Sequence, residues 1–146
     1  MDIREASMED IEQIQELSAH WNGDGQPVDS YILEKYLDSE IVICADDGEN
    51  IFGVTMLEQN ADGSMHIARF FVHPDYRDDG IGSDMMDVVT EYLDDNCTTA
   101  FASVALTNPA MNLYERYGFA ETNAYKAPYE DQIAMEREPA GDDLAL

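Results

Sequence analysis

The stretch PDYRDDGIGSDMMDVV, from Pro74 to Val89, decides the fold because it leads from an apolar strand into an amphipathic helix through a glycine-containing loop. Gly80 and Gly82 allow the backbone to pass close to a ligand. The main-chain N–H groups at the start of the following helix then suit an anion such as a diphosphate. Asp78 and Asp79 stand just before the glycines, so the loop combines an anion-binding backbone with two carboxylates that oppose an anion.

The two carboxylates can be tolerated because the donors of such a loop belong to the main chain. The side chains of Asp78 and Asp79 can turn to solvent, and Arg77 at the loop entrance offsets part of their charge. In molar salt the Debye length is about 3 Å, which screens most of the remaining repulsion. Two other phosphate-binding loops are excluded, because Met85 stands where a dinucleotide fingerprint requires a third Gly or Ala and the Gly-Lys-Ser/Thr of a Walker loop is absent. Taken alone, Gly-x-Gly is equally compatible with an ordinary turn between a strand and a helix.

The length and charge of the chain restrict its class. A chain of 146 residues suits one compact domain, which we expect over residues 1–138, followed by a frayed tail over residues 139–146. Asp and Glu number 32 against 7 Lys and Arg, which gives a formal net charge of −25. This charge excludes nucleic acids and anionic membranes as partners. Because the acids are spread along the chain, the composition is typical of halophilic, salt-accumulating microbes; a local funnel for a cationic substrate is the alternative.

The sequence indicates a cytoplasmic protein. It has no apolar run as long as a membrane span, and its N-terminus lacks the basic and apolar blocks of a signal peptide. Cys44 and Cys97 lie in apolar, strand-like segments without a Cys-x-x-Cys pair, so we expect buried thiols, with a disulfide as the alternative. The sequence contains no metal-binding motif, and it does not distinguish a monomer from a homodimer.

Apolar periodicity and turn residues predict a mixed α/β fold. A strand–helix–strand crossover around the glycine loop places two strands parallel, whereas two turn signals within residues 40–74 predict an antiparallel meander. Ser7 with Asp10 predicts a capping box, and Gly118 ends the last helix. The expected strands cover residues 2–7, three segments within 40–74, 99–106, 121–125 and 132–138, and the expected helices begin at Ser7, Asp29, the glycine loop and Pro109.

A second motif, NPAMNLYERYGF, lies one predicted strand beyond the glycine loop. Together, RFFVHPDYRDDGIG (Arg69–Gly82) and AMNLYERYGF (Ala110–Phe119) resemble the two signature motifs of the GNAT superfamily, the Gcn5-related N-acetyltransferases. The resemblance implies that family's α/β fold, with a central, mostly antiparallel sheet of six or seven strands, one parallel crossover and helices on both faces. The matching positions are Arg77, Gly80 and Gly82 in the first motif, and Ala110, Leu113, Tyr114, Glu115, Gly118 and Phe119 in the second.

The resemblance also implies a cosubstrate and a reaction. Acetyl-CoA would lie between the fourth and fifth strands, and its acetyl group would pass directly to a primary amine of a small molecule or peptide, without an acyl-enzyme. The pantetheine arm would pair with the backbone at Phe70, Phe71 and Val72. The diphosphate would lie on Arg77, Asp78, Asp79, Gly80, Ile81, Gly82 and Ser83.

Two side chains are the predicted catalytic groups. Tyr114 can protonate the departing thiolate, a core tyrosine being the alternative, and a main-chain N–H near Phe71 or Val72 can stabilise the thioester oxyanion. Some members of the family carry a Glu early in the fourth strand, and His66 occupies that slot here. An imidazole suits the deprotonation of an ammonium, directly or through water. Glu58 on the preceding strand is the alternative base.

One position departs from the family's second motif. That motif usually has an Asn seven residues before its Tyr, whereas Asn108 lies six residues before Tyr114. Asn108 is therefore either a coenzyme A contact or a cap for the helix that begins at Pro109, and Thr107 is the other residue that fills the slot. This irregularity and the undecided base leave a second hypothesis, a non-catalytic acyl-CoA-binding or interaction module on the same fold.

The net charge predicts a salt requirement. Self-repulsion among the acidic side chains is large in dilute buffer, and added salt screens it. We predict that the melting temperature rises steeply between low and molar KCl, as measured by thermal melts followed by circular dichroism. A melting temperature that does not respond to KCl would contradict the halophilic interpretation and favour the cationic-substrate funnel.

Overall fold

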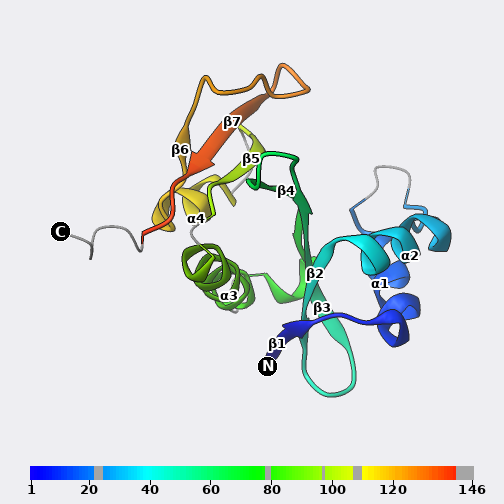
Figure 1. Ribbon diagram of the computed structural model, residues 1–146. Helices are drawn as coiled ribbons and strands as arrows, with labels where there is room; N and C mark the ends of the chain where they lie inside the picture. The colour runs from blue at the N-terminus through cyan, green and yellow to red at the C-terminus, as the bar shows by residue number, and fades with distance from the viewer. Residues whose placement is uncertain (22–24, 78–79, 97, 107–109, 141–146) are drawn as a thin grey trace. The chain divides into compact units, whose positions relative to one another are not determined.

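The computed structural model describes residues 1–21, 25–77, 80–96, 98–106 and 110–140 (Figure 1). Strands and helices follow one another along the chain in the order that the apolar pattern predicts. The strands are β1 (Asp2–Glu5), β2 (Ile41–Asp46), β3 (Ile51–Gln59), β4 (Met65–Val72), β5 (Ala100–Ala105), β6 (Ala120–Glu121) and β7 (Gln132–Arg137). The helices are η1 (Met8–Asp10), α1 (Ile11–Ser18), α2 (Ser30–Ser39), η2 (Pro74–Tyr76), α3 (Ile81–Asp95) and α4 (Ala110–Arg116).

The strands form one mixed sheet in the order β1-β2-β3-β4-β5-β7-β6. β1 pairs with β2, β2 with β3, and β7 with both β5 and β6, in each case antiparallel. β4 and β5 pair in parallel, with His66 opposite Phe101, because α3 carries the chain back between them. The predicted fold class, with its parallel crossover in a mostly antiparallel sheet, is confirmed.

The chain divides into two compact units, Met1–Glu58 with Ala68–Met85, and Gln59–Ile67 with Met86–Leu146. The core of the first unit is apolar, and its side chains come from two helices and three strands. Cys44 in this core is a free, buried thiol whose pKa burial raises to about 11, so it stays neutral, as predicted for this cysteine. Cys97 lies outside the described residues. The buried residues of the core are Ile14, Leu17, Leu33, Val42, Cys44, Ile51, Val54, Met56 and Phe71.

Arg4 connects three elements of the first unit. It donates hydrogen bonds to Asp10 in η1 at 2.8 Å and to Asp46 at the end of β2 at 2.9 Å. The hydrogen bond from Arg4 lowers the pKa of the Asp10 carboxyl. Asp10 also accepts a hydrogen bond from the Ser7 N–H at 2.8 Å, which confirms the predicted capping box.

In the second unit, Arg137 connects three elements in the same way. This arginine of β7 is only 7% exposed, and it donates to the Tyr117 carbonyl at 2.7 Å and to both oxygens of Asp94 at 2.9 and 3.1 Å. Gly118 follows with a φ of 94°, a left-handed conformation that ends α4 as predicted. α3, α4 and β7 are thereby joined around one buried guanidinium.

The predicted strand over residues 121–125 is wrong in extent, because β6 is confined to Ala120–Glu121. The Thr122 hydroxyl accepts a hydrogen bond from the Ala124 N–H at 3.1 Å, which turns the chain away from the sheet. Tyr125 then reaches back to hydrogen-bond the Ala102 carbonyl. In addition, no helix among the described residues is both long and apolar enough to cross a membrane.

The Asp94–Arg137 pair generates a prediction on stability. The hydrogen bond from Arg137 lowers the pKa of Asp94, so the pair stabilises the fold fully above the ordinary aspartate pKa. That contribution is lost as the pH falls through the lowered pKa. We predict that Asp94→Asn reduces the free energy of unfolding by about 1–2 kcal/mol at neutral pH, since Asp94 is partly exposed, and that the difference from the parent shrinks on acidification.

Urea denaturation at fixed salt measures this difference at each pH. Asp95→Asn is the matched control, because Asp95 is the next residue of α3, is exposed and loses the same charge. Equal effects of the two substitutions would show that Asp94 acts only through net charge.

Candidate active site

The end of β4 and the loop after it hold most of the predicted cofactor-binding residues. The Arg77 side chain folds back on the strand, since its Nε donates to the Val72 carbonyl at 3.0 Å and its guanidinium lies 5.2 Å from the centroid of the Phe71 ring. Gly80 has a φ of 84°, and a Cβ at this position would meet no atom within 4 Å. The left-handed backbone, not lack of space, therefore requires glycine here.

α3 begins directly after this glycine. The Asp84 N–H donates to the Gly80 carbonyl at 3.0 Å, so the helical hydrogen bonds begin there. The N–H groups of Ile81 and Gly82 precede it, and first-turn N–H groups have no carbonyl partner within their own helix. The predicted anion-binding geometry thus depends on the main chain.

The apolar side chains among the predicted cofactor-binding residues pack in or against the hydrophobic clusters. Ile81 is buried in a small cluster against which Phe70 and Val72 pack. Phe71 is buried in the larger core and makes an edge-to-face contact with Trp21, with ring centroids 5.4 Å apart. At these positions, any hydrogen bonds to a cofactor would therefore come from backbone N–H and carbonyl groups. Ser83 lies in the first turn of α3, and Asp78, Asp79, Thr107 and Asn108 lie outside the described residues.

Tyr114 lies on α4 and is buried, with 5% of its surface exposed. Its ring contacts Phe119 edge to face, with centroids 5.1 Å apart, and its carbonyl accepts the Phe119 N–H at 3.0 Å. Burial raises the pKa of the Tyr114 hydroxyl, with a smaller effect from Tyr125. The Tyr114 hydroxyl therefore keeps its proton at any physiological pH.

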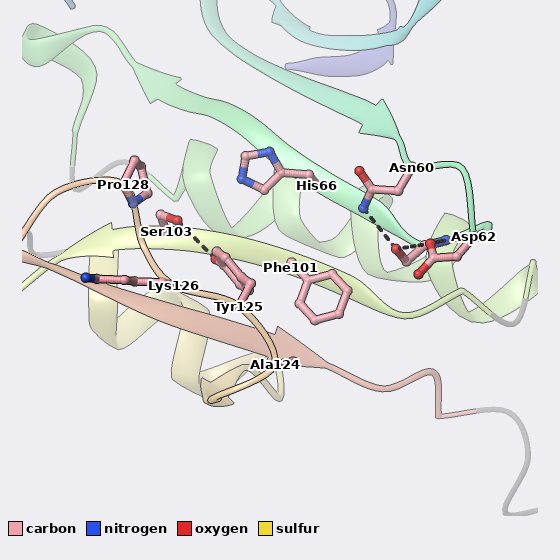
Figure 2. Close-up of a pocket in the computed structure, with 10 residues that line it drawn as sticks. Asn60, Asp62, His66, Phe101, Ser103, Ala124, Tyr125, Lys126 and Pro128 are labelled. Carbon is pink, nitrogen blue, oxygen red and sulfur yellow. Dashed lines mark hydrogen bonds between the residues drawn. The ribbon is translucent and has the colours of Figure 1, made fainter.

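His66 lines a hollow of the second unit, with a volume of about 460 Å³ (Figure 2). Phe101 and Ser103 of β5 form its floor, and Tyr125 from the segment after β6 lies over them. The Tyr125 hydroxyl lies 3.0 Å from the Ser103 Oγ, and its ring meets the Phe101 ring edge to face at 5.6 Å. Asn60, Asp62, Ser64, Ala124, Lys126 and Pro128 complete the lining.

A carboxylate stands at the rim of this hollow. Asp62 accepts hydrogen bonds from the Ser64 hydroxyl at 2.6 Å and N–H at 2.9 Å, and these bonds lower the pKa of its carboxyl. Asn60 donates to the same Ser64 hydroxyl at 2.9 Å, which fixes the turn between β3 and β4. An imidazole, aromatic rings and an ionised carboxylate in one hollow suit an amine.

The alternative base, Glu58, lies in the first unit at the end of β3. It accepts a hydrogen bond from the Tyr36 hydroxyl at 2.9 Å. Burial raises the pKa of Tyr36, and the bond to Glu58 raises it further. Glu58 thus has a donor that holds its carboxylate in place, whereas His66 faces the hollow.

Sequence reasoning missed Phe101, Ser103 and Tyr125. The two-residue alternation of buried and half-buried positions along β5 places Phe101 and Ser103 on one face, and it could have identified them. No local signal marks Tyr125, because its partners Ala102 and Ser103 are distant in the sequence.

The sequence matches the profile of the Acetyltransferase (GNAT) family over residues 8–119, so the chain belongs to this family of acetyltransferases. The predicted family is confirmed. None of the curated proteins compared with the chain matches it in sequence.

Solved structures share the fold. The ribosomal-protein-S18-alanine N-acetyltransferase from Escherichia coli has a TM-score of 0.76 at 18% identity, covering 94% of this chain and 92% of that one. An aminoglycoside 6'-N-acetyltransferase complexed with coenzyme A has a TM-score of 0.78 at 14% identity, covering 94% and 97%. The PaiA N-acetyltransferase from Thermoplasma acidophilum, in complex with coenzyme A, has a TM-score of 0.71 at 19% identity, covering 94% and 98%. At these identities the likeness shows the fold alone.

The contacts of Tyr125 generate a prediction on the hollow. Tyr125→Phe removes the hydroxyl that bonds Ala102 and Ser103 but keeps the ring on Phe101. We predict a loss of about 0.5–1.5 kcal/mol in the free energy of unfolding and faster amide exchange in residues 122–128. Hydrogen–deuterium exchange measures the second effect. Tyr129→Phe, at a side chain that is 67% exposed, should change neither quantity, and equal protection of residues 122–128 in the Tyr125 variant would contradict the prediction.

Proposed function

We propose that this acetyltransferase moves the acetyl group of acetyl-CoA directly to a primary amine of a small molecule or peptide. The observation that carries the proposal is the buried, protonated Tyr114 hydroxyl within the second family motif. Two structures of similar fold, the aminoglycoside 6'-N-acetyltransferase and PaiA, contain coenzyme A, which supports acetyl-CoA as the cosubstrate. The hollow beside His66 supports an amine as the acceptor.

The cosubstrate would be held mainly by main-chain groups. In the proposal, the N–H groups at the start of α3, after the left-handed Gly80, receive the diphosphate, and Arg77 adds one positive charge at the loop entrance. The backbone of Phe70, Phe71 and Val72 pairs with the pantetheine arm. Asp78, Asp79, Ser83 and Asn108 keep the contacts that the family resemblance implies for them.

The transfer breaks one bond and forms one. The amine nitrogen donates its electron pair to the acetyl carbon, the carbon–sulfur bond breaks, and the sulfur leaves with that bond's electron pair. A main-chain N–H near Phe71 or Val72 stabilises the charge on the carbonyl oxygen. Tyr114 supplies the proton that converts the thiolate into the thiol, and burial keeps that proton in place until the sulfur becomes anionic.

The acceptor must lose a proton before or during the attack. His66 faces the hollow and can take this proton directly or through water. Glu58, held by Tyr36, is the other candidate base. In a cytoplasm rich in salt, as the net charge suggests, these groups would act at high ionic strength.

Tyr114→Phe tests the proposal. The substitution removes the hydroxyl and keeps the ring that packs on Phe119. Acetyl-CoA binding should hardly change, because the hydroxyl matters mainly when the sulfur becomes anionic. We predict that the single-turnover rate falls about 10²- to 10⁴-fold, the usual range for a general acid, measured as thiol release with a panel of amines. Single-turnover kinetics are needed because slow product release would hide the effect.

Tyr117→Phe is the matched control, since Tyr117 is nearby in the sequence and its hydroxyl bonds Asp87 at 2.6 Å. It should keep the parent rate. A Tyr114 variant that acetylates at the parent rate would refute the proposed mechanism. Acetyl-CoA binding without thiol release for any amine would favour the non-catalytic acyl-CoA-binding module.

A further inference from the structure

Arg69 of β4 differs from Arg4 and Arg137 in having no counter-charge among the described residues. Arg4 and Arg137 each form hydrogen-bonded ion pairs with aspartates. Among the described residues, by contrast, the Arg69 guanidinium donates no side-chain hydrogen bond and forms no ion pair, although the sequence contains 32 acidic residues. Arg69 is an exposed residue of β4, so its guanidinium can be reached by a ligand from solvent. An accessible guanidinium that no described carboxylate neutralises is a candidate contact for an anion.

Trp21 provides a second donor at the same place. The Arg69 guanidinium lies 5.0 Å from the centroid of the Trp21 indole, and the indole meets Phe71 edge to face at 5.4 Å. The Trp21 Nε1 is buried and has no hydrogen-bond partner among the described residues. Buried indole N–H groups usually have one. Two neighbouring side chains thus offer donors for which this part of the chain has no acceptor.

The chemistry that satisfies both donors is a planar oxyanion. A guanidinium presents parallel N–H groups that match the two oxygens of a carboxylate, and an indole N–H donates one further bond. The buried Thr55 hydroxyl donates a hydrogen bond to the Arg69 carbonyl at 2.8 Å, which holds the backbone at Arg69 in place.

The first unit also holds an opposite charge. The Tyr36 hydroxyl donates to the Glu58 carboxylate at 2.9 Å, which holds this carboxylate in place. The first unit therefore carries a positive side chain, Arg69, and a negative one, Glu58. This arrangement is complementary to a molecule that carries both an ammonium and a carboxylate.

We propose that the acceptor is an amine that carries a carboxylate, of the amino-acid class, and that Arg69 and the Trp21 indole N–H bind this carboxylate. The proposal rests on the proposed function, because it names the class of amine that receives the acetyl group. Arg69 is then a specificity-determining residue, and the amine of the same molecule is the acetylated group.

Matched probes test the proposal. Each pair is an amino acid and the amine that lacks its carboxylate: L-phenylalanine with 2-phenylethylamine, L-lysine with cadaverine, and β-alanine with ethylamine. For at least one pair, the parent should acetylate the carboxylated member with a kcat/KM about 10- to 100-fold higher, as expected for hydrogen bonds to a charged group. Arg69→Met should remove this preference and leave the rate with the decarboxylated amine nearly unchanged. Arg69→Lys should keep part of it, since the charge remains but the planar fork is lost.

Arg116→Met is the control for the loss of one positive charge, because Arg116 is exposed on α4. It should keep the parent preference. The proposal is overturned if the parent does not discriminate within any pair, or if the Arg69 and Arg116 variants behave alike. Far-UV circular dichroism of each variant verifies that it is folded. If Arg69→Met does not fold, the comparison of Arg69→Lys with the parent tests the proposal.

A binding measurement separates this proposal from the proposed function. Trp21 is the chain's single tryptophan, so its fluorescence reports occupancy at the indole without any turnover. 3-Phenylpropionate, which has the carboxylate but no amine, should change this fluorescence in the parent and bind at least about 10-fold more weakly to Arg69→Met. If that result is obtained while no amine is acetylated, the acetyl-transfer proposal fails and the carboxylate site stands. If amines are acetylated but 3-phenylpropionate leaves the fluorescence unchanged, the carboxylate site fails and acetyl transfer stands.

Discussion

Two buried or half-buried arginines each join three elements of the fold. Arg137 donates hydrogen bonds to the Tyr117 carbonyl and to both carboxylate oxygens of Asp94. Arg4 donates hydrogen bonds to Asp10 and Asp46, so these ties use two of the seven basic side chains. In a chain with 32 acidic residues, each cation is scarce and its position matters. The pKa values of Asp10 and Asp94 are lowered, which ties the stability of both units to the ionised state of these two carboxyls. The remaining carboxylates repel one another, and added salt weakens this repulsion.

Because basic side chains are few, the arginines that form no ion pair with the described residues, such as Arg77 and Arg69, are of particular interest. Arg77 lies on the end of β4, at the entrance of the proposed cofactor loop. Arg69 lies on an indole, with no carboxylate from the described chain against it. In the proposed carboxylate site, this guanidinium is used for binding while it packs on the Trp21 indole.

The candidate site combines rigid backbone with a small number of polar side chains. Gly80 sets the backbone turn before α3, and the carbonyls and N–H groups around it need no particular side chain. Tyr114 contributes a hydroxyl that burial keeps protonated, which suits a group that donates only late in the reaction. His66, Phe101 and Tyr125 line a hollow, and the Tyr125 hydroxyl is held by hydrogen bonds with Ala102 and Ser103. In the proposed function, acceptor choice would therefore depend on side chains, and cofactor binding on the main chain.

The sequence by itself determined the features that arise from short-range chemistry. The capping box of Ser7 and Asp10, the turn at Gly118 and the parallel crossover around α3 depend on neighbouring residues, and all were predictable. The extent of β6 was predicted wrongly, because the hydrogen bond from Ala124 to Thr122 competed with the strand. Only the tertiary structure decided that Tyr125 reaches Ala102, that Arg69 lies on Trp21 and that Tyr36 holds Glu58. These contacts join residues far apart in the chain, and packing selects such partners from many that local pattern leaves equivalent.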